Sequence, residues 1–320
     1  MNTITFEKLG LTFHINRSFS LFGTGITIHW YAVIILLGVI LGFSYALWFA
    51  KKEKLDSEYL YDVLLWGLPS AIVMARVYYV VFNFSQYREN LWDVFKIWNG
   101  GIAIYGAVIG AVISTYIYTR VKKQNTLQIF DMGAFGLVVG QAIGRWGNFV
   151  NQEAFGTNTD SIFSMSGNLI RSQLMKMEQE GMAVTSAMGV HPTFLYESVW
   201  NLLGAVVLGF FHRYKKHHGE VFWLYLSWYG LGRFFIEGLR TDSLMFYNVR
   251  ISQCVALLTL ILGVVMFVIS RRKPVIIIEE SKETLTENSP REEETPEVSK
   301  ETIKPKKLKG AKTTDADNRK

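Results

Sequence analysis

Long runs of apolar residues dominate the chain up to about residue 273. Each run covers about 20 residues, the length an α-helix needs to cross the roughly 30 Å hydrocarbon core of a bilayer. A water-soluble core does not need runs that long. The pattern therefore predicts an all-α, polytopic membrane protein with about seven transmembrane helices, at 29–50, 60–83, 100–121, 127–149, 193–213, 220–240 and 251–270.

Basic residues collect at the ends of alternate runs and predict the orientation. Cytoplasmic loops of membrane proteins are enriched in Lys and Arg, so these ends are expected in the cytoplasm, with the N-terminus outside and the C-terminus inside. The net charge of +6 needs no nucleic-acid partner, because the positive-inside pattern accounts for it. The residues concerned are Lys51, Lys52 and Lys54, then Arg120, Lys122 and Lys123, then Arg213, Lys215 and Lys216, and finally Arg271, Arg272 and Lys273.

The same pattern divides the chain into three parts. Residues 1–28 form an expected extracytoplasmic segment, 29–273 the seven-helix transmembrane domain, and 274–320 a charged cytoplasmic tail without aromatic residues. Such a tail cannot bury enough surface to order itself and is expected to be disordered. The loop 151–192 is expected outside. In it Ile170, Leu174 and Met177 are spaced as on one face of a helix, which predicts either a helix lying on the bilayer or a small packed cap.

Small residues and the single cysteine add two expectations. Glycines at helical spacing let helix backbones approach closely, so the third and fourth spans are expected at the bundle centre. Cys254 excludes an internal disulfide and any multi-thiolate metal site, and it is expected to pack as a small apolar residue. The glycines concerned are Gly106, Gly110, Gly133, Gly136 and Gly140.

Ionisable residues within the spans mark a polar site. They are costly in a bilayer and usually face a functional interior. In the sixth span Tyr229, Arg233, Glu237 and Arg240 share one helical stripe, with Arg233 roughly 10 Å from the outer end at helical rise. The inner halves of the spans carry almost no polar residues. The stripe therefore predicts a site within the outer leaflet.

Further polar residues fall at the same predicted depth. Two or more arginines there would suit a phosphate or a carboxylate, because guanidinium offers a planar, bidentate fork. Each residue also has a plainer explanation: the tyrosines could belong to an aromatic belt, the glutamates could only neutralise arginines, and Arg76 or Arg240 could reach headgroups. These residues are Gln141, Arg145 and Asn148 in the fourth span, Arg76 in the second, and Tyr31, Tyr105, Tyr196 and Glu197 near the starts of three others.

Several local motifs resemble those of one enzyme family. The segment GRWGNFVNQEAFG at 144–156 looks like the signature of the bacterial prolipoprotein diacylglyceryl transferases. HWY at 29–31, WNGGIAIYG at 98–106, HPTFLYE at 191–197 and YGLGRFFIE at 229–237 are also similar to that family. The resemblance covers about residues 25–273 and leaves the tail outside.

The resemblance implies an activity and a location. It implies a seven-helix enzyme of the bacterial cytoplasmic (plasma) membrane, whose catalytic domain is 29–273 and whose active site faces outward. It would transfer the diacylglyceryl group of phosphatidylglycerol to the lipobox cysteine of preprolipoprotein signal peptides, releasing glycerol phosphate, as the first step of lipoprotein maturation. It implies neither a cofactor nor a metal. An organic-anion transporter and a non-catalytic lipid-binding protein are the alternatives.

The resemblance also assigns roles to residues. Arg233 would be an essential cation, Asn148 and Glu153 would shape the site, and Tyr105 stands where many relatives carry a histidine that has been considered a general base. Tyrosine is a poor base near neutral pH, so His29 and His191 are alternatives. The residues expected to bind phosphatidylglycerol are Arg145, Tyr31, Asn151, Arg76, Tyr229, Glu237 and Arg240.

Overall fold

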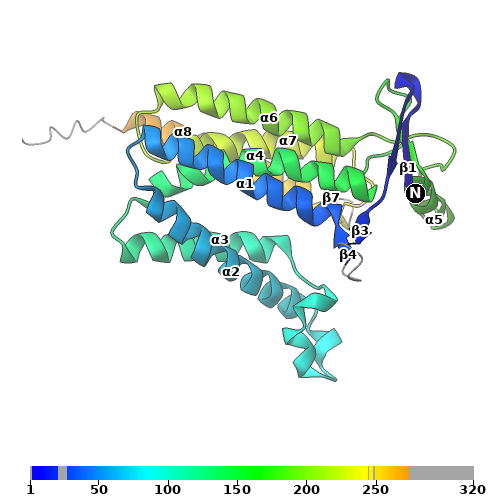
Figure 1. Cartoon of the computed structure of the whole chain (residues 1–320), viewed down its shortest axis with the longest axis horizontal. Helices are drawn as coiled ribbons and strands as arrows, with labels where there is room; N and C mark the ends of the chain where they lie inside the picture. Colours follow the sequence, from blue (N-terminus) through cyan, green and yellow to red (C-terminus); the bar gives the residue numbers. More distant parts are fainter. Residues whose placement is uncertain (1, 21–26, 244, 248, 274–320) are drawn as a thin grey trace, which may run out of the picture. The chain divides into compact units, whose positions relative to one another are not determined.

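The computed structural model describes residues 2–20, 27–243, 245–247 and 249–273. The chain separates into two units, Met1–Val275 and Ile276–Lys320, and the description below concerns the first (Figure 1). The predicted tail at 274–320 lies outside the described residues.

Helices make up most of the described chain. Six segments are long and apolar enough to cross a membrane by length and composition: Trp30–Lys52, Ser57–Phe82, Ile104–Val121, Thr126–Asn151, Thr193–Tyr214 and Ile251–Arg272. The protein is therefore a polytopic helical membrane protein. The helices are α1 (Trp30–Lys52), α2 (Ser57–Phe82), α3 (Ile104–Val121), α4 (Thr126–Asn151), α5 (Asn168–Gln179), α6 (Thr193–Phe211), α7 (Glu220–Glu237) and α8 (Ile251–Arg272).

The helix α7 is not among the six, although 220–240 was predicted as a span. Its 18 residues include Glu220, Arg233 and Glu237, and these charges reduce its mean hydropathy. It nevertheless packs along α8 and against α4 and α6. The charged side chains that weaken its apolar signal are the ones that build the site described below.

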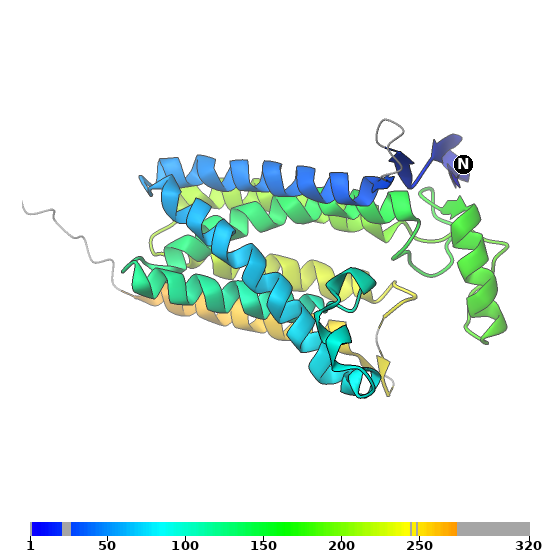
Figure 2. The same ribbon diagram turned by 60° about the horizontal axis from the view of Figure 1, so that its bottom comes forward.

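Short strands, which the sequence pattern did not predict, form a cap. Strands β1 (Asn2–Phe6), β2 (Leu11–Ile15) and β5 (Met165–Gly167) make an antiparallel sheet in the order β2-β1-β5, with Ile4 opposite Gly167. Figures 1 and 2 place this sheet and α5 beyond the end of the bundle at which α1 begins. Two more hairpins pair β3 (Ser18–Ser20) with β4 (Thr27–His29), and β6 (Met245–Phe246) with β7 (Val249–Arg250). The pairing of β1 with β5 joins segments about 160 positions apart, which no local pattern encodes.

The cap has its own apolar core. Ile4 on β1 and Ile170 and Leu174 on α5 are fully buried, in a cluster that includes Phe149 at the end of α4. The loop 151–192 was expected to form either a helix lying on the bilayer or a packed cap, and the structure contains the packed cap. Short 3-10 helices fill the connections, at Glu7–Leu9, Phe84–Tyr87, Leu91–Phe95, Ile97–Asn99 and His212–Tyr214.

Glycines bring α1 and α4 into backbone contact. A Cβ on Gly42 would overlap the carbonyl oxygen of Gly136, and one on Gly38 would lie 3.2 Å from the carbonyl oxygen of Gly140. Such contacts are possible only between residues without side chains. The close approach holds the middle of α4 against α1.

The α2–α3 hairpin uses the same device. A Cβ on Gly106 would overlap the carbonyl oxygen of Met74, and one on Gly110 would lie 2.6 Å from the carbonyl oxygen of Ser70. These two glycines allow a close helix contact, but the prediction that the third span lies at the bundle centre is wrong, because α3 packs mainly on α2. Gly133 is not at a close contact, because a Cβ there would meet no atom within 4 Å.

A reciprocal tryptophan pair fixes α6 against α7. The Trp200 indole donates to the carbonyl of Trp228 at 3.0 Å, the Trp228 indole donates to the carbonyl of Trp200 at 2.9 Å, and the rings stack 4.4 Å apart. Each ring occupies space left by a glycine, Trp200 at Gly232 and Trp228 at Gly204. Because Gly232 precedes Arg233, this packing sets the register of the charged stripe.

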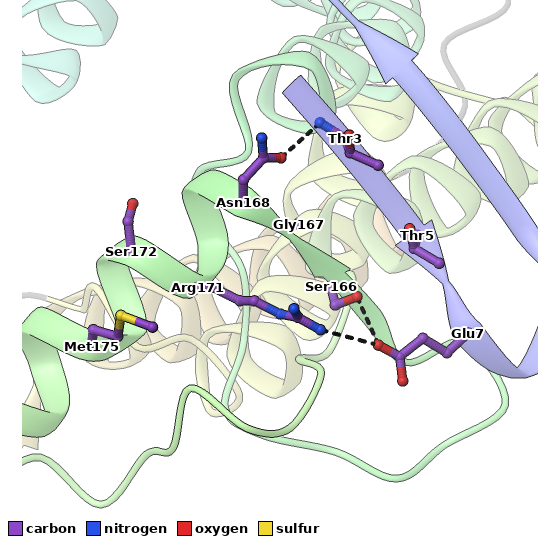
Figure 3. Close-up of a pocket in the computed structure, with 9 residues that line it drawn as sticks. All are labelled: Thr3, Thr5, Glu7, Ser166, Gly167, Asn168, Arg171, Ser172 and Met175. Atoms are coloured by element: carbon purple, nitrogen blue, oxygen red, sulfur yellow. Dashed lines mark hydrogen bonds and ion pairs between the residues drawn. The ribbon is translucent and has the colours of Figure 1, made fainter. Parts of the chain in front are cut away.

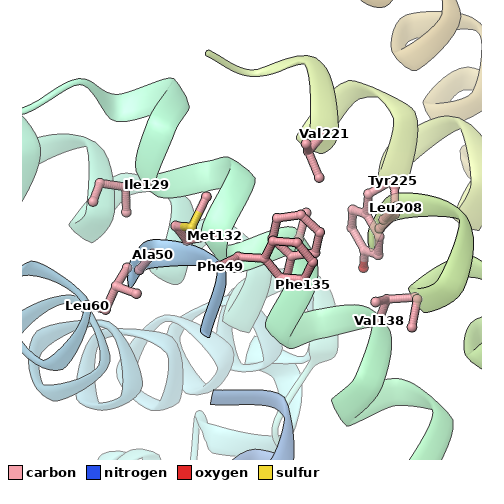
Figure 4. Close-up of a cluster of buried hydrophobic side chains, with 12 residues drawn as sticks. Phe49, Ala50, Leu60, Ile129, Met132, Phe135, Val138, Leu208, Val221 and Tyr225 are labelled. Carbon is pink, nitrogen blue, oxygen red and sulfur yellow. The ribbon is translucent and has the colours of Figure 1, made fainter. Parts of the chain in front are cut away.

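The main apolar core lies at the other end of the bundle, where α1 meets α4, α6 and α7 (Figure 4). Its centre is Phe49 of α1 stacked on Phe135 of α4, with ring centroids 3.7 Å apart. The cluster comprises Phe49, Ala50, Leu60, Ile129, Met132, Ala134, Phe135, Val138, Ala205, Leu208, Val221 and Tyr225.

Buried charges accompany this core and correct the prediction of an almost non-polar inner half. Asp131 and Glu220 are fully buried. Asp131 accepts the backbone N–H groups of Gly219 at 2.7 Å and Phe222 at 2.8 Å, and so caps the start of α7. A carboxylate at a helix N-terminus is stabilised by the unpaired amides and the helix dipole. The acid therefore serves a helix that is far from it in sequence.

Lys215 joins this acid to the end of α1. Its ammonium lies 2.9 Å from Asp131 and also pairs with Glu53, which His212 contacts at 3.1 Å. Burial opposes ionisation of Glu53, but the charge and hydrogen bond of Lys215 outweigh it and lower the pKa of Glu53. The network is thus a structural clamp between α1, α4 and the α6–α7 connection.

The glycine contact predicts a difference between two alanine substitutions in the same protein. Gly42→Ala forces α1 and α4 apart and should lower the free energy of unfolding by about 1–3 kcal/mol. Gly133→Ala meets open space and should be neutral or stabilising by up to about 1 kcal/mol. Thermal unfolding in detergent measures both. Equal losses of stability would contradict the close packing.

Candidate functional site

The site is assembled from three helices at the end of the bundle that carries the cap. Arg145 and Asn148 lie in the last two turns of α4, Glu197 in the first turns of α6, and Arg233 and Glu237 at the end of α7. The i, i+4 spacing of Arg233 and Glu237 places both on one face of α7.

Glu197 is the centre of the site. Its Oε2 lies 2.6 Å from Nη2 of Arg145, and its Oε1 lies 3.0 Å from Nη1 of Arg233 and 3.7 Å from Nη1 of Arg240. Its side chain is only 5% exposed. One buried carboxylate thus holds arginines from α4, from α7 and from the segment after α7.

Glu237 completes the buried part of the network. Its Oε2 lies 2.6 Å from Nη2 of Arg233, an ion pair without the alignment of a hydrogen bond, and 3.8 Å from Nε of Arg240. Arg240 also makes a bidentate pair with Asp242, at 2.9 and 2.7 Å, but Asp242 is 43% exposed at the periphery. The buried part of the network, three arginines and two glutamates, has one positive charge in excess, which the half-exposed Asp242 balances from the periphery.

Backbone contacts lock the segment after α4 between the other two helices. Gly156 donates to the carbonyl of His191 at 2.9 Å, and Thr157 donates to the carbonyl of Leu239 at 2.8 Å. A Cβ at Gly156 would lie 2.8 Å from Cβ of His191, so glycine is required for this approach. The lock brings the region of Arg145, the start of α6 and Arg240 together.

Asn148, Asn151 and Glu153 form a second polar group beside the arginines. The side-chain amides of both asparagines donate to Oε1 of Glu153, at 3.1 and 3.2 Å. Arg17, from the turn between β2 and β3, donates to the backbone carbonyl of Asn151. Its cation lies at the C-terminus of α4, where the helix dipole favours positive charge. The sequence analysis did not predict Arg17, which lies outside every apolar run.

Two of the predicted tyrosines face the bundle. Tyr31, at the start of α1, packs on Gly147 of α4, where an added Cβ would lie 2.6 Å from its ring. Tyr229 of α7 stacks on Tyr225, with ring centroids 6.1 Å apart, and the Tyr225 hydroxyl accepts from the side chain of Gln141 at 2.9 Å.

Tyr105 stands apart from the arginine network. It is the second residue of α3, is 37% exposed, and its nearest ring is that of Tyr78, 6.4 Å away. Its hydroxyl has no hydrogen-bond partner among the described residues, so it is free to meet a ligand. His191, the alternative base, contacts the Tyr196 hydroxyl at 3.2 Å, and burial lowers the pKa of its imidazole. His29 ends β4 and is exposed.

The guanidinium of Arg76 is bound by backbone carbonyl groups. Its guanidinium donates to the carbonyls of Val94, Gly100 and Gly101, each at 2.7 Å, and of Asp93 at 2.6 Å. It is 7% exposed. The residue therefore holds the connection between α2 and α3, and the structure does not bring it to the other arginines.

Comparison with known proteins places this site in a family. The family model of prolipoprotein diacylglyceryl transferases matches residues 19–269, more than three quarters of the chain. The chain belongs to this family. A phosphatidylglycerol–prolipoprotein diacylglyceryl transferase of Listeria monocytogenes serotype 4b is 46% identical over 248 residues, covering 78% of this chain and 87% of the relative.

Further transferases of the family align over the same extent. The protein of the same name from Pediococcus pentosaceus is 43% identical over 252 residues, 78% of this chain and 88% of the relative. The one from Streptococcus suis is 44% identical over 248 residues, 77% and 89% respectively. The segment matched by the diacylglyceryl transferase family contains the whole arginine network, whereas Arg17 and β1 precede it.

Two residues near the site were not among the predicted catalytic or lipid-binding residues. Glu197 was predicted at the depth of the site, with the alternative that it only neutralises arginines, and it contacts all three. In the sequence, Glu197 was indicated by its position at the end of the HPTFLYE segment, which resembles the family. Gln152, fully buried just after α4, was not predicted, and its polar side chain gave no apolar signal to detect.

The network predicts unequal effects for two carboxylates that contact Arg240. Glu197→Gln leaves three arginines without their shared buried partner and should cost about 3–5 kcal/mol of stability. Asp242→Asn removes a half-exposed partner and should cost less than about 1 kcal/mol. Thermal unfolding of both variants in the same detergent checks this. A Glu197→Gln protein as stable as Asp242→Asn would contradict the central role of Glu197.

Proposed function

We propose that this protein transfers the diacylglyceryl group of phosphatidylglycerol to the lipobox cysteine of preprolipoproteins, releasing glycerol phosphate, the first step of lipoprotein maturation. The observation that carries the proposal is the family match over residues 19–269, which includes every residue of the arginine network. The relatives from three genera bear the name of this activity.

The proposed setting is the bacterial plasma membrane, with the site at the outer face. We include α7 as a seventh span, because it packs along α8 and against α4 and α6. The N-terminus is outside and the C-terminus cytoplasmic, as the basic residues at the opposite end favour. Pairing of β1 with β5 supports this topology, since it requires residues 1–28 and the loop 151–192 to lie on one side.

The arginines suit the phosphate of phosphatidylglycerol. Each guanidinium carries five N–H donors in a plane, and the two buried glutamates engage only some of them. Arg145 and Arg233 are 22% and 17% exposed at the side chain, so part of each faces outward from Glu197. A phosphate entering from the outer leaflet would accept from these free donors and would compete with the half-exposed Asp242 for the positive charge that the two buried glutamates leave. Asn148, one turn after Arg145 on α4, and its partners Asn151 and Glu153 add polar groups at the same end of this helix.

The chemistry is a displacement at carbon. The cysteine thiol, with an ordinary pKa of about 8.5, gives its proton to a base as the sulfur attacks the glycerol carbon that bears the phosphate ester. A C–S bond forms, the C–O bond breaks, and its electron pair leaves with glycerol phosphate. Arginines that the fold has already positioned stabilise the negative charge that develops on the departing oxygen. Tyr105 orients the thiol or phosphate, and neutral His191 is the alternative proton acceptor.

A transport function has less support. A transporter would need polar groups along a path to the opposite face. Among the described residues, the buried acids at that end are paired with cations, as in the clamp of Glu53, Lys215 and Asp131 and the pair of Glu220 with Arg271. A lipid-binding protein without catalysis would share the arginine site, and only turnover separates it from the transferase.

Reconstitution tests the proposal directly. Purified protein in vesicles containing phosphatidylglycerol should convert a lipobox peptide to its thioether-linked diacylglyceryl form and release glycerol phosphate. Arg145→Ala and Arg233→Ala should each reduce the rate at least about 100-fold, the scale of losing one charge-stabilising donor. Arg213→Ala, an exposed arginine at the other end, is the control and should retain activity. Absence of product from folded wild-type protein would refute the function.

The Tyr105 hydroxyl is tested by a matched pair of variants. Tyr105→Phe removes only the hydroxyl and should lower the rate at least about 10-fold, because even one positioning hydrogen bond is worth roughly 1.4 kcal/mol in the transition state. Tyr78→Phe, whose ring lies 6.4 Å from that of Tyr105, should leave the rate unchanged. A Tyr105→Phe enzyme at full rate would exclude any role for the hydroxyl.

A further inference from the structure

The cap contains a groove that the arginine site does not use. It has a volume of about 430 Å³ and lies between β1 and α5 (Figure 3). That volume is within the range of about 300–1,000 Å³ that ligand pockets occupy. We name it the cap groove and define it by Thr3, Thr5, Glu7, Ser166, Arg171 and Ser172 among its lining residues.

Alternation along β1 makes the groove polar. Ile4 and Phe6 point into the cap core, so Thr3 and Thr5 point to the other face of the strand. On α5 the helical periodicity separates the residues that face the core from those that face the groove. Ile170 and Leu174 are buried in the core, whereas Arg171, Ser172 and Met175 face the groove. These residues line the groove between β1 and α5, and Figure 3 shows Arg171 reaching from α5 toward Glu7.

A single residue connects the groove to the catalytic end of α4. Gln152 adopts a left-handed backbone conformation, and its side-chain oxygen accepts the N–H of Leu169 at 3.1 Å. Its amide donates to the carbonyl of Thr3 at 3.5 Å. Gln152 lies between Asn151 and Glu153 in sequence, so the groove begins beside the polar group of the site.

The lining excludes several ligands. Met175 is its only large apolar side chain, so the groove does not suit an acyl chain. Glu7 and Arg171 balance each other, so it does not suit an isolated anion. Their ion pair is 3.6 Å long and more than half exposed, which makes it weak and exchangeable for ligand contacts. Ser166 donates to Glu7 and Ser172 donates to the carbonyl of Leu169, so their oxygens remain as acceptors for the N–H groups of an extended peptide, and Arg171 supplies donors for its C=O groups.

We propose that the cap groove binds, in extended form, the polar segment of the preprolipoprotein that follows the lipobox cysteine. The proposal rests on the proposed function, in which the cysteine reacts at the outer end of α4 and the chain after it continues outside the membrane. Thr3, Thr5 and Glu7 precede the family-matched segment 19–269, whereas Ser166, Arg171 and Ser172 lie within it.

Two peptides with the same lipobox test the groove. One ends just after the cysteine, and the other continues with a polar segment long enough to reach the cap. Wild-type protein in phosphatidylglycerol vesicles should show a KM several-fold lower for the long peptide. Ser172→Trp, which fills the groove, and Arg171→Ala should raise the KM of the long peptide toward that of the short one. The kcat and the KM of the short peptide should stay unchanged.

Lys176→Ala is the matched control, since it removes a charge from the same helix outside the groove lining. It should behave as wild type. Equal KM values of the two peptides with wild-type protein would overturn the proposal. So would a Ser172→Trp variant that affects both peptides alike, or one that only dissociates an oligomer, which would identify the groove as a contact between copies of this chain.

A binding measurement separates this proposal from the proposed function. A fluorescent peptide carrying only the polar segment, without the lipobox, should bind wild-type protein and bind Ser172→Trp several-fold more weakly. This result does not depend on turnover. If wild-type protein binds this peptide but transfers no lipid to either lipobox peptide, the transferase assignment fails while the groove remains. If it transfers lipid but does not bind the peptide, the groove proposal fails alone.

Discussion

Three arginines from separate parts of the chain converge on the buried carboxylate of Glu197, and the arrangement of the end of the bundle that carries the cap depends on this contact. Arginines this close repel each other, so they require a shared anion to remain together in a medium of low dielectric constant. Glu197 supplies it from α6, with Glu237 as a second partner. The free N–H donors of these arginines are what the phosphate of the proposed substrate would meet. Stability and the proposed phosphate binding therefore rest on the same carboxylate.

Contacts between uncharged residues position these arginines and glutamates. The Trp200–Trp228 pair sets the register of α6 against α7, and the backbone contact of Gly42 with Gly136 fixes α4 against α1. At the far end, Lys215 ties acids of α1 and α4 together. The bundle is thus clamped at both ends by ion pairs and joined between them by glycine and tryptophan contacts. This rigidity positions the guanidinium groups before any ligand arrives.

The cap shows how much of the structure can be predicted from the local pattern of apolar and polar residues. The spacing of Ile170 and Leu174 indicated a helix with an apolar face, which the structure contains. What that face meets could not be derived, because its partner is Ile4, on a strand about 160 residues earlier. Short strands whose pairing is long-range carry too few alternating positions to be recognised. The same pairing creates the groove that we assign to the substrate peptide.

The sequence by itself determined the helical membrane architecture, because apolar runs of bilayer length have no other use. It also indicated the arginine stripe, because charges inside such runs are costly. Only the tertiary structure decided which charge has which task. Arg76 and Arg233 are both arginines within apolar helices. The guanidinium of Arg76 donates to loop carbonyls, whereas that of Arg233 forms an ion pair with Glu197. Asp131 proved to cap α7 from α4. The reason is physical: hydropathy depends on each residue alone, whereas hydrogen-bond and ion-pair partners are set by groups that folding brings within about 3 Å.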